Sequence, residues 1–151
     1  MRMIMSRSAH TSDAPPPPEE LVVRAVMRLG RSLRRAAPAV ELTTGALAVL
    51  IRLNKDGATS AAALARAEGL QPQSLSRVLA RMTQDGMIER AVNADDRRRH
   101  VIAITNRGRR ALGWAMDERR RWIATVMEER LAPAERDTLI AAATIMLKLA
   151  D

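Results

Sequence analysis

The stretch from residue 71 to residue 105 restricts the possible folds more than any other part of this chain. A helical pattern begins at Pro72, a residue well suited to the first helical position, and ends at Gly86. Two alternating stretches, 87–92 and 100–104, then favour β-strands. The stretch therefore predicts a helix that leads directly into a short hairpin.

A second predicted helix lies just before this stretch. Either Thr59 or Ser60 can cap its beginning, and Gly69 ends it with the apolar Leu70 behind. Only the short turn 69–71 separates the two helices. Two helices joined in this way form a helix-turn-helix, whose second helix reads the major groove of DNA. With the hairpin added, the pattern predicts a winged helix-turn-helix with double-stranded DNA as its partner.

The predicted reading helix has an apolar face and a polar face. Its inward positions are Leu75, Val78, Leu79 and Met82. Its outward positions are mostly amides, a hydroxyl and guanidinium groups: Gln73, Ser74, Arg77, Ala80, Arg81 and Gln84. Amides and guanidinium groups form bidentate hydrogen bonds with base edges. We therefore expect this helix to contact DNA through Gln73, Ser74, Ser76, Arg77 and Arg81.

The loop between the two predicted strands has the sequence NADDRRR, in which two acids precede three arginines. A neighbouring carboxylate can hold an arginine in position to enter a narrow minor groove. We therefore assign Arg97 and Arg98 to a DNA-binding wing, with Asp96 as the carboxylate that holds the arginine. The simpler alternative is a solvated charged turn without a DNA contact.

Helical patterns also precede this region. The first runs from Glu19 until Pro38 stops it, and arginines at 24, 28, 31 and 35 form a separate stripe along it. Thr43 or Thr44 caps the next helix, which ends at Gly57. Its predicted inward residues are Leu47, Leu50, Ile51 and Leu53.

Two further helices are predicted after the hairpin. Asn106 is expected to cap a long one, and Pro133 begins the last one. The helices at both ends of the chain carry more apolar residues than a small winged domain needs, which suggests a helical dimer interface. The fold class is therefore mainly α with a small β-hairpin wing, a winged helix-turn-helix with N- and C-terminal dimerisation helices.

The domain organisation follows from the same patterns. Residues 1–18 end in four prolines and predict a disordered arm. Residues 19–151 predict a single domain, with 19–37 and 106–151 as dimerisation helices and 43–105 as the DNA-binding part.

Charge and composition narrow the function. The formal charge is +8, and nearly all the cations are arginines, which implies an acidic partner such as nucleic acid. The chain has no cysteine, and its two histidines are too far apart in sequence to share a helix face, so neither a metal site nor another cofactor is expected. Because no nucleophile elbow or phosphate-binding glycine loop is present, an enzyme is not expected either. Without a membrane span or a secretory signal, the expected location is cytoplasmic.

From about Glu19 to the end of the chain, the order of these elements resembles the MarR family of dimeric transcriptional regulators. The segment SLSRVLARMTQDGMIER is similar to the family's reading helix and first wing strand. DDRRRHVIAITNRGRRAL is similar to its wing, its second strand and the start of its fifth helix. Asp96 and Arg98 occupy the places of the family's Asp-x-Arg wing motif.

The resemblance implies a homodimeric repressor that binds a pseudo-palindromic operator and is released by a small aromatic or anionic effector. An effector pocket would involve Arg31, Leu47 and Trp114, although a solvated arginine and a core tryptophan are the simpler interpretations. Gly45 and Ala46 depart from the family pattern, which usually has a polar residue and a large aromatic there.

Two other functions remain open from the sequence. The charge would also suit a non-specific architectural DNA-binding protein. An interaction module that has lost operator binding would keep the fold but lack a polar reading face.

Overall fold

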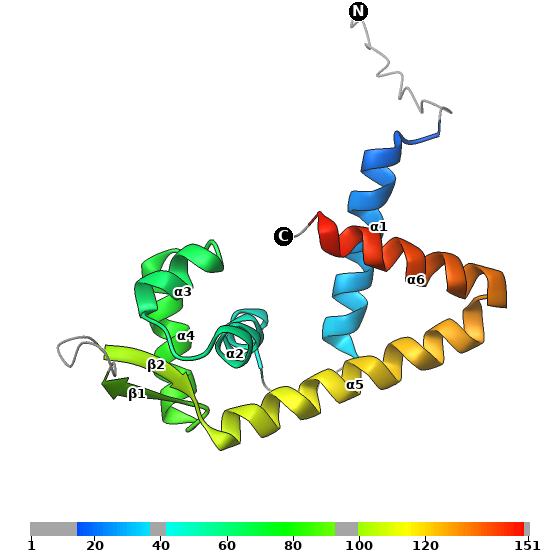
Figure 1. Ribbon diagram of the computed structural model, residues 1–151. Coiled ribbons are helices and arrows are strands. Elements are labelled where there is room, and N and C mark those ends of the chain that lie inside the picture. Colours follow the sequence, from blue (N-terminus) through cyan, green and yellow to red (C-terminus); the bar gives the residue numbers. More distant parts are fainter. Residues whose placement is uncertain (1–14, 37–41, 93–99, 150–151) are drawn as a thin grey trace, which may run out of the picture. The chain divides into compact units, whose positions relative to one another are not determined.

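The computed structural model describes residues 15–36, 42–92 and 100–149. The chain divides into two units, Met1–Ser32 and Leu33–Asp151. Most of helix α1 (Pro18–Arg35) belongs to the first unit (Figure 1). The other elements belong to the second: α2 (Thr44–Asp56), α3 (Ala61–Ala67), α4 (Pro72–Gln84), β1 (Ile88–Val92), β2 (His100–Ile104), α5 (Asn106–Arg130) and α6 (Pro133–Lys148). The mainly helical fold with a small hairpin is therefore confirmed.

The two strands form an antiparallel hairpin. Ile88 pairs with Ile104 at one end of the hairpin, and Val92 pairs with His100 at the other. Ile102 of β2 also exchanges two backbone hydrogen bonds with Thr59, of 3.1 and 2.7 Å between N and O. This bridge attaches the segment before α3 to the hairpin. Because Thr59 is held there, Ser60 is the residue that caps α3, and its side chain accepts a hydrogen bond from the N–H of Ala63.

The hydrophobic core lies in the second unit, where α2, α3 and α4 meet the hairpin and the first part of α5. Leu64 is its only contribution from the short helix α3 among the buried residues. The core residues are Ala46, Val49, Leu50, Leu53, Leu64, Leu75, Met82, Ile88, Ile102, Ile104 and Leu112. Alternate strand residues and helical positions three or four apart thus converge, as the sequence periodicity predicts.

Two local predictions were wrong. Ile51 was expected to face inward, but 43% of its surface is exposed, because the buried stripe of α2 is set by Val49, Leu50 and Leu53 and leaves Ile51 to one side. Asn106 was expected to cap α5, but the cap is Thr105. Thr105 has extended backbone geometry and its side chain accepts from the N–H of Gly108, whereas Asn106 is already helical.

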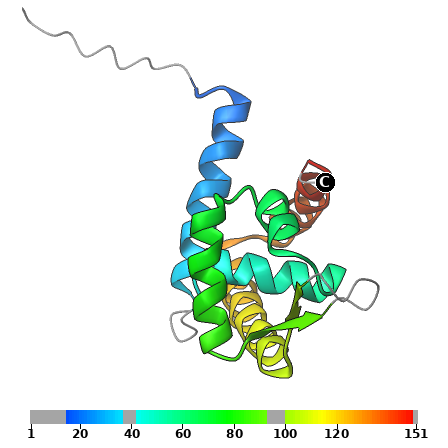
Figure 2. The same cartoon turned by 90° about the vertical axis from the view of Figure 1, so that its left-hand side faces the viewer.

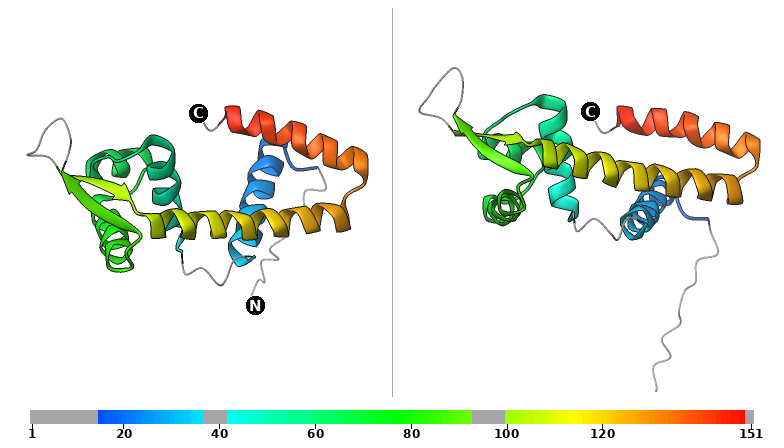
Figure 3. Two further views of the ribbon diagram at one scale, coloured as in Figure 1. Left: turned by 60° about the horizontal axis from the view of Figure 1, so that its bottom comes forward. Right: turned by 90° about the horizontal axis from the view of Figure 1, so that it is seen from below.

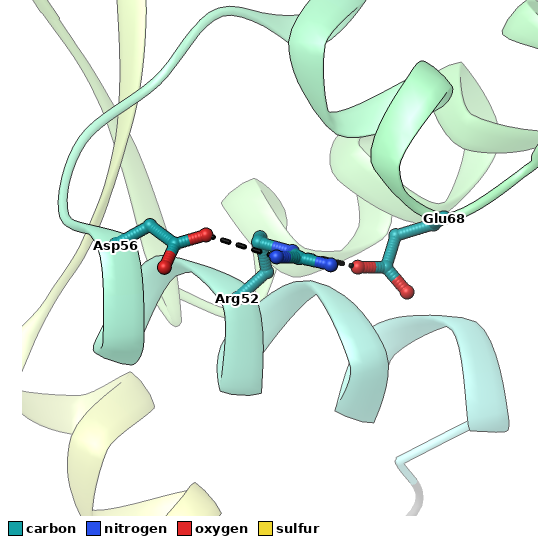
Figure 4. A network of polar contacts seen from close by, with 3 residues as sticks. All are labelled: Arg52, Asp56 and Glu68. Atoms are coloured by element: carbon teal, nitrogen blue, oxygen red, sulfur yellow. Dashed lines mark hydrogen bonds and ion pairs between the residues drawn. The ribbon is translucent and has the colours of Figure 1, made fainter. Parts of the chain in front are cut away.

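Arg52 connects α2 to the end of α3 (Figure 4). Its guanidinium donates to a carboxylate oxygen of Asp56 at 3.0 Å and to one of Glu68 at 3.1 Å. Hydrogen bonds to Asp56 and Glu68 raise the pKa of Arg52, so the group stays charged at every pH that the folded protein meets. Glu68 directly precedes the turn of the helix-turn-helix. The contact therefore holds that turn against α2.

In the second unit, α2–α4 and the hairpin form a lobe, called the winged lobe below. This lobe and the beginning of α6 lie at opposite ends of α5. Figures 1 and 3 show the hairpin and α2–α4 around the first turns of α5, while the chain turns back after α5 and enters α6. Neither α6 nor α1 contains a buried residue. Their apolar side chains are largely exposed: Leu21, Val22, Val23, Val26, Met27 and Leu29 on α1, and Ile140, Ile145, Met146 and Leu147 on α6, followed by Leu149 just after its end. Among the helices in the described residues, none is long and apolar enough to cross a membrane.

Candidate nucleic-acid interface

Helix α4 is anchored on one face only. Leu75 and Met82 are almost completely buried, and Val78 and Leu79 pack partly against the same core. The helix begins at Pro72, and Gln71 occupies the cap position without a side-chain hydrogen bond. The four inward positions predicted from the sequence are therefore confirmed. Figure 2, which views the second unit from the side of α4, shows the helix in front of α2.

The opposite face of α4 is exposed to solvent. Gln73, Ser74, Arg77, Arg81 and Gln84 are all exposed, as is Ala80 between them. The N–H groups and hydroxyls of this face could therefore reach an external partner without any change in the core. Arg81 lies beside Asp85, with 3.9 Å between Nε and Oδ2, so its guanidinium is oriented along the helix.

Ser76 differs from the other predicted contact residues of α4. It is exposed, but its Oγ donates to the backbone oxygen of Pro72 at 2.8 Å. It also lines a hollow of about 450 Å³ between α4 and the hairpin. Ser76 therefore lies on the side of α4 that faces the hairpin, and not in the middle of the polar face.

Two polar hairpin residues that line this hollow were not predicted from the sequence. Arg90 and His100 come from β1 and β2, and Thr83 and Ala80 come from α4. Arg90 follows Ile88 by two positions and His100 precedes Ile102 by two, so strand alternation places each on the same side as a buried isoleucine. That alternation was the signal that could have found them.

The polar face of α4 is held at a defined distance from the hairpin by the turn between them. Gly86 has a φ of +67°, a left-handed conformation that glycine adopts at little cost. The N–H of Met87 donates to the backbone oxygen of Met82 at 2.9 Å, which closes the end of α4. Strand β1 then begins at Ile88. Helix α4 and the hairpin are therefore consecutive elements joined by a short, hydrogen-bonded turn.

The predicted wing residues Asp96, Arg97 and Arg98 lie outside the described residues. The structure fixes the two ends of their loop, since Val92 and His100 are paired at the end of the hairpin. Their contacts with DNA stay a prediction.

The three residues predicted to bind an effector differ from one another in burial and in the unit to which they belong. Leu47 is half-buried against the core, and Trp114 on α5 is 40% exposed. Arg31 is an exposed residue of the other unit. Over residues 15–36, 42–92 and 100–149 there is no group of three or more His, Asp or Glu side chains that could hold a metal ion.

Comparisons with known proteins point to one family. The model of the MarR family matches residues 42–100. An HTH-type transcriptional regulator from Mycobacterium bovis is 36% identical over 130 residues, which cover 84% of this chain and 88% of that protein.

Solved structures have the same fold. A protein from Mycobacterium tuberculosis is 27% identical with a TM-score of 0.76, covering 90% of this chain and 96% of its own. A MarR variant from Escherichia coli has a TM-score of 0.78 at 18% identity, covering 89% and 99% of the two chains, which supports the fold alone. The mycobacterial and enterobacterial structures thus share the arrangement described above.

Proposed function

This chain belongs to the MarR family of transcriptional regulators, and we propose that it is a homodimeric repressor that binds a pseudo-palindromic operator and is released by a small aromatic or anionic effector. Members of this family bind DNA and act as dimers, and they are not enzymes.

The polar face of α4 carries the proposal. A helix buried through Leu75 and Met82 projects amides, hydroxyls and guanidinium groups from its other side. These groups match the donors and acceptors that base pairs display in the major groove. A module that had lost operator binding would have no reason to keep so polar a face, so this rival is disfavoured.

Dimerisation gives the operator its expected symmetry. The exposed apolar residues of α1 and those of α6 each supply a surface that a second copy of the chain would cover. A two-fold dimer presents two reading helices, which fit half-sites about 34–36 Å apart on one side of the duplex. The operator should therefore be a pseudo-palindrome with half-sites one helical turn apart.

Replacing Arg77 by alanine tests the assignment of the reading face. Loss of a bidentate contact to a base should weaken operator binding by about 1–3 kcal/mol and relax base choice at one position of each half-site. Fluorescence anisotropy with the selected operator and its single-base variants measures both effects. Arg121→Ala, which removes another exposed arginine from α5, is the charge-matched control and should leave base preference unchanged.

Arg98→Ala should change DNA affinity in a different way from Arg77→Ala. A wing arginine in the minor groove contributes mainly through charge and groove width, so its loss should weaken binding to most sequences alike and lower the salt dependence of binding. Affinity measured across a series of salt concentrations gives this slope. Wild-type affinity in both arginine variants would overturn the proposed interface.

The specific repressor is distinguished from a non-specific architectural protein by competition. An operator selected from random duplexes should resist competing genomic DNA, since specific sites are typically bound at least about a thousandfold more tightly. Equal competition by operator and genomic DNA would favour the architectural function.

The effector part of the proposal rests on Leu47 and Trp114, which both belong to the second unit. Benzoate serves as the probe because it is both aromatic and anionic. Binding near Trp114 should change the protein's tryptophan fluorescence and lower its affinity for the operator, whereas Trp114→Phe should lose the fluorescence change and keep the signal of Trp122. If benzoate alters neither fluorescence nor operator affinity, this class of effector is wrong for the protein.

A further inference from the structure

One threonine joins the end of the reading helix to the beginning of α5. The Oγ1 atom of Thr105 donates a hydrogen bond to the backbone oxygen of Gly86 at 2.7 Å and accepts one from the N–H of Gly108 at 3.1 Å. The Thr105 N–H donates to the backbone oxygen of Met87 at 3.0 Å. The turn that ends α4 is therefore bonded directly to the first turn of α5.

Packing at the same point leaves little freedom. The backbone oxygen of Met87 lies so close to Gly108 that a β-carbon there would be only 2.1 Å away. The side chain of Arg107 lies beside Gly86, with its Cδ 3.6 Å from the position of a β-carbon on that glycine. Arg107 and Gly108 of α5 thus lie in contact with Gly86 and Met87, two residues of the turn that follows α4.

This junction matters because α5 leads from the winged lobe to α6 (Figure 3). In a dimer formed through the terminal helices, the angle between α4 and α5 determines how far apart the two reading helices lie and how they are rotated. We propose that Thr105 is a positioning residue for operator recognition, whose hydroxyl fixes this angle and so sets the spacing of half-sites that the dimer accepts. The role rests on the proposed binding of a palindromic operator by a dimer.

The substitution Thr105→Val tests the role without a change of shape. Valine keeps the side-chain volume but can neither donate to Gly86 nor accept from Gly108. Thr105 is only half-buried, so water can satisfy the freed backbone groups and the variant should stay folded. Affinities are measured for the selected operator and for duplexes with one or two base pairs inserted or removed between the half-sites.

The variant should bind the selected operator about tenfold more weakly if only about one dimer in ten then holds its reading helices at the spacing that the operator requires. The decisive result is the spacing profile of the variant, which is its affinity for the operator as a function of the number of base pairs between the half-sites. The ratio of affinities for the selected and altered spacings should fall in Thr105→Val and return in Thr105→Ser, which restores the hydroxyl. A merely structural role would lower stability without changing this ratio.

Thr43→Val provides the matched control. Thr43 caps α2 through a hydrogen bond of 3.2 Å from the N–H of Ala46, similar in length to the cap on α5. The same substitution thus removes the same kind of cap from another helix of the lobe. Its spacing profile should equal that of the wild-type protein, and an equal flattening in Thr43→Val and Thr105→Val would overturn the positioning role.

A second measurement needs no DNA. Because the chain has no cysteine, spin labels can be attached at Gln73→Cys on α4 and Arg121→Cys on α5 without background labelling. Thr105→Val should broaden the distribution of distances between the labels, while Thr43→Val should not. If Thr105→Val leaves both the distance distribution and the spacing profile unchanged, the role of Thr105 alone is overturned. If the wild-type protein itself shows no preference for one half-site spacing, the proposed binding of a palindromic operator is overturned as well.

Discussion

Gly108→Ala is expected to be among the most destabilising single substitutions in this chain. A β-carbon at this position would lie 2.1 Å from the backbone oxygen of Met87 and 2.9 Å from Cγ1 of Ile104. The first of these atoms belongs to the main chain that follows α4, so it cannot move aside as a flexible side chain would. Relief of the overlap requires α5 to shift from the hairpin.

The net effect is the difference between strain and helix propensity. Overpacking of this kind costs about 1–3 kcal/mol or more, and the higher helix propensity of alanine returns about 1 kcal/mol at most. Since the contact is with backbone, the strain lies at or above the upper end of that range, and we expect a net decrease of about 2 kcal/mol or more in the free energy of unfolding. Urea denaturation followed by circular dichroism measures it.

Gly113→Ala is the matched control on the same helix. No atom lies within 4 Å of a β-carbon placed there, and the residue is exposed. The same substitution should therefore stabilise the protein by about 0.5–1 kcal/mol, because alanine is the better helix former. The two variants are predicted to change stability in opposite directions. Similar effects from both would mean that close packing at Gly108 does not hold α5 against the hairpin.

The sequence predicted the elements of this fold well because the signals are periodic. Pro72 and Pro133 mark where two helices begin, and the apolar spacing of α4 identifies its buried face. The polar face of α4 then follows by exclusion. For the same reason, five candidate DNA contacts could be placed on one helix before its packing was known.

Contacts between segments that are distant in the sequence could not be predicted from periodic patterns. Nothing in the pattern distinguishes Thr105 from Asn106 as a cap, because both side chains can accept a hydrogen bond, and the choice depends on how the chain leaves β2. Gly108 has no signal either, since its requirement comes from Met87, about twenty positions earlier. The clamp of Arg52 on Glu68 is likewise set by how α2 and α3 meet.

The exposed apolar residues of the terminal helices are not explained by contacts within a single chain. In a globular protein, an apolar helix such as α6 is normally buried, yet it has no buried residue. Exposed surface of this kind is expected where a second copy packs. The composition of α6 therefore has a physical explanation in the proposed dimer that the isolated chain does not provide.

Placing two glutamates on α6, by Ile140→Glu together with Leu147→Glu, should have the largest effect on operator binding. The two residues are seven positions apart, so they share a face, and 58% and 69% of their surfaces are exposed. Two-fold symmetry would bring four new carboxylates into the interface. We expect sedimentation to show a monomer, and operator affinity to fall by about 10²–10⁴-fold, because the two half-sites are no longer bound by one linked particle.

The same variant should bind an isolated half-site as wild-type protein does. Its α6 contributes nothing to the core, and the winged lobe lies at the other end of α5, so the reading face itself is unaltered. An unchanged thermal unfolding transition of the lobe would confirm that folding is intact. A variant that remains dimeric and keeps full operator affinity would exclude this face of α6 from the interface and leave α1 as the apolar surface through which the copies associate.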